Sequence, residues 1–205
     1  MLGDDGRVRA ISPEGSDETM RDSPGLPERW GATAAEAETT YPCDELADTP
    51  YIALTRAIDV DAPVTVIFRW LCQLRAAPYS YDWVDNWGRR SPRELTPGLN
   101  QLEPGQSFTV VTITSYATDH HITGRATPAA QRLFGVISLT YAVASRGPQR
   151  SRLISRLDVH QPTRLWEKAR YRFLAWGDLI MMRKQLRTLK DLAEQQVRNS
   201  GTIAR

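Results

Sequence analysis

The sequence is poor in cysteine and histidine, and it contains no long uninterrupted run of apolar residues. Its two cysteines, Cys43 and Cys72, are too few for a disulfide framework and show no metal-ligand spacing, so we expect reduced thiols and a cytoplasmic protein. The longest apolar stretch, residues 173–182, falls short of the roughly 20 residues that cross a bilayer and is interrupted by Asp178. The first residues lack the apolar centre of a secretory signal, so none is expected.

Several motifs that mark particular chemistries are also missing. The sequence has no glycine-rich phosphate loop and no G-x-S-x-G nucleophile elbow. His120 and His121 are neighbours on a predicted strand, so their side chains leave opposite faces and cannot easily share one ion. Basic residues occur without a nucleic-acid-binding motif. We therefore expect no metal, no cofactor and no nucleic-acid partner.

Charge is distributed unevenly along the chain. Residues 1–50 hold 12 acidic side chains against four arginines, whereas the remainder holds 22 basic against 12 acidic side chains. Residues 1–40 are rich in Gly, Pro, Ser, Asp and Glu and poor in large apolar groups, which predicts a disordered acidic tail. We expect one domain over residues 41–199 and a disordered C-terminus over 200–205. The asymmetry suggests that the tail lies over a basic surface of the domain.

The region after the tail begins with a predicted strand and a predicted helix. Residues 53–60 have strand character, and Asp61-Ala62-Pro63 suits the start of a helix, with Asp61 as cap and Pro63 in the first turn. Apolar residues then repeat at helical spacing and form one stripe. These residues are Val66, Ile67, Trp70, Leu71 and Leu74.

Downstream, the pattern alternates and then becomes helical again. Strands are predicted over residues 106–116, 120–127, 133–144 and 150–160, joined by short turns as in an antiparallel meander with one wet face. In the last strand, Arg152, Arg156 and Asp158 point to the face opposite Leu153. A final helix is predicted over residues 170–199. Its apolar stripe, which favours packing on the sheet over a short coiled coil, comprises Ala175, Leu179, Met182, Leu186, Leu189 and Ala193.

This order of elements resembles the START-like, or SRPBCC, superfamily of helix-grip proteins. The string WLCQLRAAPYSYDWVDNWGRRSPRELTPG, residues 70–98, is also similar to a bacterial subgroup labelled polyketide cyclase/dehydrase-like. The resemblance implies an α+β helix-grip fold, in which a curved antiparallel β-sheet wraps around a long C-terminal α-helix. It also implies a cavity between sheet and helix that holds a small hydrophobic molecule such as a lipid, polyketide or isoprenoid.

Candidate ligand-binding residues follow from strand faces and the helical stripe. We expect the cavity walls and mouth to be formed by Tyr79, Tyr81, Trp83, Val110, Leu139, Tyr141, Trp176, Leu179 and Met182. The aromatics of the loop at 78–92 have an alternative role, which is to plug one end of the domain. The segment Arg164–Arg172, which is basic and aromatic, is a candidate for transient contact with a membrane surface during ligand exchange. The sequence leaves the oligomeric state open.

A second interpretation is an enzyme that resembles the aromatase/cyclases. Such an enzyme would hold a reactive polyketone and move protons with a few polar groups, for which Tyr81, Asp82, Arg90 and His121 (or His120) are the candidates. Capping or pairing with a nearby arginine is the competing role of Asp82. A third interpretation is a partner-binding or stress-response protein in which the cavity is vestigial.

Overall fold

The computed structural model describes residues 25–47, 49–80 and 90–203. The helices and strands of this part, in chain order, are β1 (Arg29–Trp30), α1 (Ala34–Glu38), η1 (Asp44–Leu46), β2 (Tyr51–Val60), α2 (Val64–Cys72), η2 (Gln73–Arg75), β3 (Ser107–Phe108), β4 (Val111–Ala117), β5 (His121–Ala126), α4 (Pro128–Phe134), β6 (Ile137–Gly147), β7 (Arg150–His160) and α5 (Leu165–Ile203).

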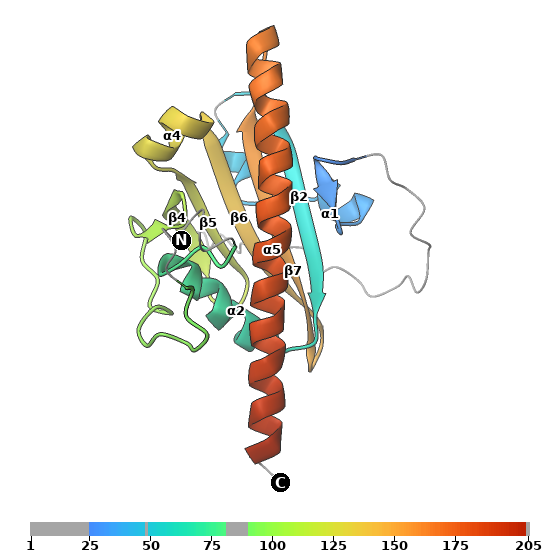
Figure 1. The fold of residues 1–205 in the computed structure, drawn as a ribbon, viewed down its shortest axis with the longest axis vertical. Coiled ribbons are helices and arrows are strands. Elements are labelled where there is room, and N and C mark those ends of the chain that lie inside the picture. The colour runs from blue at the N-terminus through green and yellow to red at the C-terminus, as the bar shows by residue number, and fades with distance from the viewer. Residues whose placement is uncertain (1–24, 48, 81–89, 204–205) are drawn as a thin grey trace, which may run out of the picture.

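The described strands form one sheet in the order β1-β2-β7-β6-β5-β4-β3. All neighbours are antiparallel except β1, which pairs with β2 in parallel at the edge. Helix α5 crosses one face of this sheet and projects beyond both of its ends (Figure 1). The predicted α+β helix-grip fold, a curved antiparallel sheet around a long C-terminal helix, is confirmed.

Helix α5 begins five residues before the predicted start. Its early start has a local cause, because the carboxylate of Glu167 accepts hydrogen bonds from the backbone N–H groups of Thr163 (2.9 Å) and Arg164 (3.0 Å). The helix continues to Ile203, so residues 200–203, expected to be disordered, are helical. Its 39 residues span about 58 Å. No described helix is both long and apolar enough to cross a membrane.

The main core lies between the sheet, α2 and α5. Alternation along the strands turns one set of side chains toward α5, and the predicted stripe of α5 meets them, which buries both. Its members include Ile67, Trp70, Leu71, Phe108, Ile113, Ile122, Leu139, Tyr141, Leu153, Leu186 and Leu189. Asp61 is not the cap of α2 as expected: Pro63 occupies the N-cap position, and the exposed Asp61 carboxylate pairs with Arg150 instead.

Two predicted strands differ from the structure. The strand expected over residues 106–116 is a tight hairpin, because Phe108 pairs with Val111 and the turn residue Thr109 has φ +51°. The strand expected from residue 133 begins at Ile137. The preceding helix α4 was missed, although Thr127 caps it and Gly135, with φ +87°, ends it.

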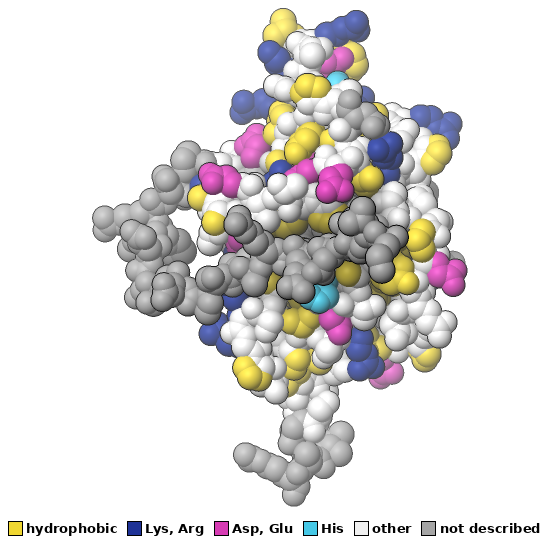
Figure 2. All heavy atoms as spheres, turned by 180° about the vertical axis from the view of Figure 1, so that it is seen from behind, with side chains coloured by type: hydrophobic (Ala, Val, Ile, Leu, Met, Phe, Trp, Pro, Cys, Tyr) yellow, Lys and Arg dark blue, Asp and Glu magenta, His cyan; other side chains and the backbone are white. Residues whose placement is uncertain are grey.

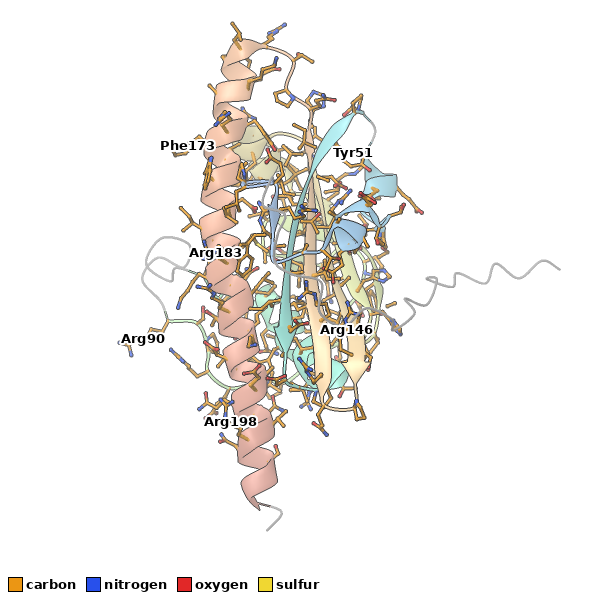
Figure 3. All side chains as sticks on the ribbon, turned by 90° about the vertical axis from the view of Figure 1, so that its right-hand side faces the viewer. Tyr51, Arg90, Arg146, Phe173, Arg183 and Arg198 are labelled. Atoms are coloured by element: carbon orange, nitrogen blue, oxygen red, sulfur yellow. The ribbon has the colours of Figure 1, made fainter. Side chains whose placement is uncertain are left out.

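The outer face of the sheet, expected to be wet, is covered by an N-terminal segment, residues 25–47. Residues 25–40 of this segment belong to the tail that was predicted to be disordered. Two acidic side chains bind it to the sheet: Glu36 to Arg152 at 2.8 Å, and Asp44 to Arg156 at 3.2 Å. Arg146, on the same side and away from α5 (Figure 3), is a second arginine that pairs with Glu36, at 3.4 Å. An acidic segment therefore does lie on a basic surface, and buried ion pairs order it despite its low apolar content.

Candidate functional site

A cavity of about 260 Å³ lies beneath the first turns of α5. Helix α4 and strand β7 end near each other, and α5 overhangs those ends in the upper part of Figure 1. Large apolar side chains dominate the lining because α5 turns its apolar residues toward the ends of α4, β6 and β7. They are Phe134, Val136, Val159, Pro162, Trp166 and Leu174.

Three of the polar side chains that line this cavity are engaged in structural bonds. His160 Nδ1 lies 2.9 Å from Thr49 Oγ1. Glu167 accepts the backbone hydrogen bonds at the start of α5, which hold its pKa below the usual value and keep it ionised. The Tyr171 hydroxyl donates to Glu28 at 3.0 Å, and burial together with that carboxylate raises the pKa of Tyr171.

Arg170 is the fourth polar side chain of the lining. It is exposed, and it forms no salt bridge with any residue in the described ranges. Its Nη2 atom lies close to Gly135: a side chain at position 135 would place its Cβ only 3.1 Å from this nitrogen. A cavity with apolar walls and one guanidinium suits an apolar molecule that carries an acidic or polar group.

The predicted apolar walls lie elsewhere in the interior. Leu139, Tyr141 and Leu179 are buried, but none of them lines the cavity of about 260 Å³. The Tyr141 hydroxyl donates to the side-chain oxygen of Gln185, whose amide donates to the Pro78 carbonyl. Half-buried Met182 completes this arrangement, with its sulfur 3.6 Å from the Tyr141 hydroxyl oxygen. The middle of the sheet–helix interface is therefore packed with side chains.

The other predicted binding residues that the structure describes lie at separate places in the molecule. Val110 is a hairpin residue and Trp176 lies on the outer side of α5, with 40% and 42% of their surfaces exposed. Val110 was expected to face inward because one continuous strand was predicted over residues 106–116. The hairpin interrupts that strand, so the predicted alternation of side chains between the two sheet faces does not hold at Val110. Tyr79 is buried against Trp70, ring edge to ring face. Tyr81 and Trp83 lie outside the described residues.

The predicted catalytic residues that the structure describes, Arg90 and His121, do not line this cavity. Tyr81 and Asp82 lie outside the described residues, and Arg90 is an exposed residue next to that gap. His121 pairs with Ala142 in the sheet and alternates with the core residue Ile122, so its side chain is on the face turned away from α5. Burial, with His120 nearby, lowers the pKa of His121.

Sequence reasoning missed most of the cavity lining. His160 was set aside as a lone histidine at a strand end, and nothing near it in the sequence marks it as special. Trp166, Arg170 and Tyr171 did carry a signal, because the segment Arg164–Arg172 is unusually aromatic and basic. That signal was assigned to surface contact, since the helix was expected to begin only at residue 170.

A second cluster of titratable groups lies under the N-terminal segment. Ligand atoms of Cys43, Asp44 and Asp158 lie within 4.8 Å of one another, a spacing that suits a metal ion. The guanidinium of Arg156 already bonds both carboxylates, at 3.2 Å to Asp44 and 2.9 Å to Asp158. Burial, together with Asp158, raises the pKa of the Cys43 thiol. Because the Arg156 guanidinium already occupies the place of a cation and the Cys43 thiol is neutral, we assign this cluster the role of attaching the N-terminal segment to the sheet.

Asp158 gives this cluster a pH dependence. Burial, reinforced by Asp44, raises the pKa of Asp158 to about 7 from 3.8. Asp158 therefore binds its proton more tightly in the folded protein than in the unfolded chain. The resulting contribution of Asp158 to stability is present below about pH 4 and is lost as the pH rises to about 7. Asp158→Asn should therefore gain stability relative to the native protein between pH 5 and pH 8, as measured by urea unfolding. Parallel profiles for the two proteins would contradict this assignment, and Asp61→Asn, at an exposed pair, is the control.

Comparison with known proteins finds similarity at the level of the fold. No protein-family model and no curated protein matches the sequence. A START superfamily protein from Mycobacterium smegmatis is similar, with TM-score 0.44 and 13% identity, covering 72% of this chain and 99% of that one. The di-domain ARO/CYC StfQ from the steffimycin pathway gives 0.45 and 15%, covering 75% of this chain and 54% of that one.

A third similar structure is norcoclaurine synthase from Thalictrum flavum, in complex with dopamine and hydroxybenzaldehyde. Its TM-score is 0.42 at 13% identity, and the match covers 78% of this chain and 94% of that one. Similarity of this degree assigns no activity, since one fold hosts many functions. The sheet order and the long C-terminal helix give this chain the helix-grip fold, also called START-like, that its sequence predicts.

Proposed function

We propose that the protein binds a small hydrophobic molecule in the cavity beneath the first turns of α5. The observation that carries this proposal is the lining itself, in which six large apolar side chains accompany one guanidinium that forms no salt bridge with a described residue. Apolar walls supply the binding free energy by removing ligand surface from water. A few fixed polar groups set the orientation.

The size of the cavity limits the ligand. Its volume of about 260 Å³ is just below the roughly 300–1,000 Å³ of sites for drug-sized molecules. The cavity therefore suits a molecule with a single ring system, or one segment of a longer chain. Arg170 favours an acidic group at the mouth, because a guanidinium bonds a carboxylate through a planar pair of donors.

Binding is better supported than catalysis by the described residues. A general acid or base must reach the reacting atoms and change its protonation during the reaction. His160, Glu167 and Tyr171 are each already bonded to another part of the protein. The polar lining is thus suited to orient a passive ligand.

Filling the cavity should abolish binding. Leu174→Trp adds an indole to the lining. We expect it to lower the affinity for a fluorescent fatty-acid probe by at least about tenfold, because the added side chain occupies the space that the ligand needs. Leu133→Trp makes the same change at a position on α4 that is 64% exposed and does not line the cavity. Equal probe binding by both variants and the native protein would refute the assignment of the site.

Removing the guanidinium should weaken carboxylate ligands selectively. A hydrogen bond to a charged group is worth roughly 1.5–3 kcal/mol, so Arg170→Met should reduce affinity for a fatty acid about tenfold or more. Affinity for the corresponding fatty alcohol should change little. Arg172→Met is the matched control, because Arg172 is exposed on the same helix but does not line the cavity. An equal loss for acid and alcohol would assign Arg170 a packing role only.

A further inference from the structure

The first half of α5 exposes an unusual number of large apolar side chains. The exposed fractions are 86% for Leu165, 81% for Phe173, 58% for Trp166, 53% for Ile180 and 42% for Trp176. Half of the exposed large hydrophobic residues of the described chain therefore lie on 16 consecutive residues of one helix. Apolar side chains gathered on one exposed face mark an interaction surface, whereas scattered ones need no explanation.

Four of these residues share one side of the helix. Leu165, Phe173, Trp176 and Ile180 follow each other at steps of eight, three and four, which returns each to the same face. We call these four the exposed stripe. It lies apart from the buried positions Ala175 and Leu179, which face the sheet. Figure 3 shows Phe173 on the side of α5 that points away from the sheet.

Positive charge accompanies the exposed stripe. Residues 164–187 contain seven basic side chains and only two acidic ones, Glu167 and Asp178. Glu167 bonds the start of the helix, and Asp178 pairs with Arg56 beneath it. The exposed cations of this stretch that form no salt bridge with a described residue are Arg164, Lys168, Arg170, Arg172, Lys184 and Arg187. Basic and hydrophobic side chains also lie together at the projecting upper end of the molecule in Figure 2.

This pairing of charge and apolar surface selects one kind of partner. A second copy of the chain would bring one basic flank against another, and the like charges would oppose association. An anionic bilayer instead offers negative headgroups to the cations and an apolar boundary to the stripe. Helices that lie in a membrane interface combine Lys and Arg with Trp, Phe and Leu in this way. Tryptophan is particularly suited to the headgroup level.

We propose that the exposed stripe docks the protein on the surface of an anionic lipid bilayer. Leu165, Phe173, Trp176 and Ile180 enter the headgroup boundary, and the neighbouring cations bind the anionic lipids. Trp166, which is exposed at the edge of this surface, also lines the cavity. Docking thus brings the cavity opening to the membrane. The inference goes beyond ligand binding and stands without it, since the stripe and the cavity use different residues.

The test is flotation of the full-length protein with vesicles of phosphatidylcholine, with and without phosphatidylserine. We expect binding that requires phosphatidylserine and falls at high salt, because headgroup attraction is screened. Phe173→Ser with Ile180→Ser should weaken it by at least about tenfold. Lys168→Glu with Arg172→Glu should weaken it by a similar factor, since each cation near an anionic surface is worth about fivefold. Leu133→Ser, an exposed apolar change on α4, is the control and should bind as the native protein does.

Either a failed flotation experiment or a change of oligomeric state would overturn the proposal. The first outcome is native protein that fails to float with the anionic vesicles, or a Phe173→Ser/Ile180→Ser variant that floats as well as the native protein. The second outcome is a dimer by light scattering that the same variant converts to a monomer, which would make the stripe a contact between copies. Circular dichroism and probe binding in vesicle-free solution should be unchanged in this variant. A loss of probe binding in native protein would affect the proposed function and leave the docking result intact.

Discussion

Arg152→Met should lower the free energy of unfolding by about 3–5 kcal/mol. The Glu36 carboxylate is 5% exposed and receives hydrogen bonds at 2.8 Å from Arg152 Nε, Arg152 Nη2 and the backbone N–H of Thr33. Burial alone would raise the pKa of Glu36, but these bonds and the charge of Arg146 hold it below 4.5. Without Arg152, a carboxylate is left buried with too little compensation, and the N-terminal segment loses its attachment.

Urea unfolding followed by circular dichroism measures this loss. Glu36→Gln combined with Arg152→Met should recover much of it, because no unpaired charge remains buried. The cost of the single substitution should also shrink as the pH falls below about 4.5, since a lowered pKa contributes stability only while the carboxylate is ionised. Arg150→Ala on the same strand removes an exposed pair and should cost less than about 1 kcal/mol. Equal costs for Arg150 and Arg152 would contradict this account of the segment.

Arg56→Met should destabilise the attachment of α5 to the sheet, and more strongly at high pH. Arg56 is 1% exposed on β2 and pairs with Asp178 of α5 at 3.0 Å. Burial raises the pKa of Asp178 to about 6, and Arg56 acts against this rise. At pH 8 the variant leaves an ionised, uncompensated carboxylate, which costs about 3 kcal/mol or more. At pH 5 Asp178 takes up a proton, so the cost is smaller.

The measurement is the free energy of unfolding of both proteins at pH 5 and pH 8. In the native protein, the raised pKa of Asp178 contributes stability below about pH 4 that is lost as the pH rises through about 6. Removing Arg56 raises this pKa further and steepens the same trend. Asp178→Asn should remove the trend in both backgrounds. A cost of Arg56→Met that is the same at both pH values would show that Asp178 is not the group left uncompensated.

The fold could be predicted because its main signals are periodic and local. The apolar stripes of α2 and α5 and the alternation in β6 and β7 each identify an element within a short window. The N-terminal segment could not be predicted in this way. Glu36 is 116 residues from Arg152 in sequence, and a buried ion pair over such a separation leaves no periodic pattern. The composition of this segment, which is poor in apolar residues, therefore predicted disorder, whereas its ion pairs with Arg152 and Arg156 order it.

The lining of the cavity beneath α5 was not recognised in the sequence for a related reason. Its lining comes from the ends of elements, around Phe134, Val159 and Trp166, where predicted boundaries are least certain. Helix α4 was not predicted and its last two residues were assigned to a strand, and α5 was predicted to begin five residues too late. The cavity residues of these two helices were therefore not recognised. The predicted wall residues Leu139 and Tyr141 do face α5, but the side chains of Gln185 and Met182 fill the space beside Tyr141.

The most direct test of ligand binding is photo-crosslinking with a diazirine-bearing fatty acid, followed by peptide mapping. The cavity predicts labels on residues 134–136 and 166–174, which are the two segments of α4–β6 and α5 that line it. Leu174→Trp should remove these labels, and Leu133→Trp should leave them. Labels confined to the middle of the sheet, around residues 139–143, or equal labelling of all three proteins, would contradict the account.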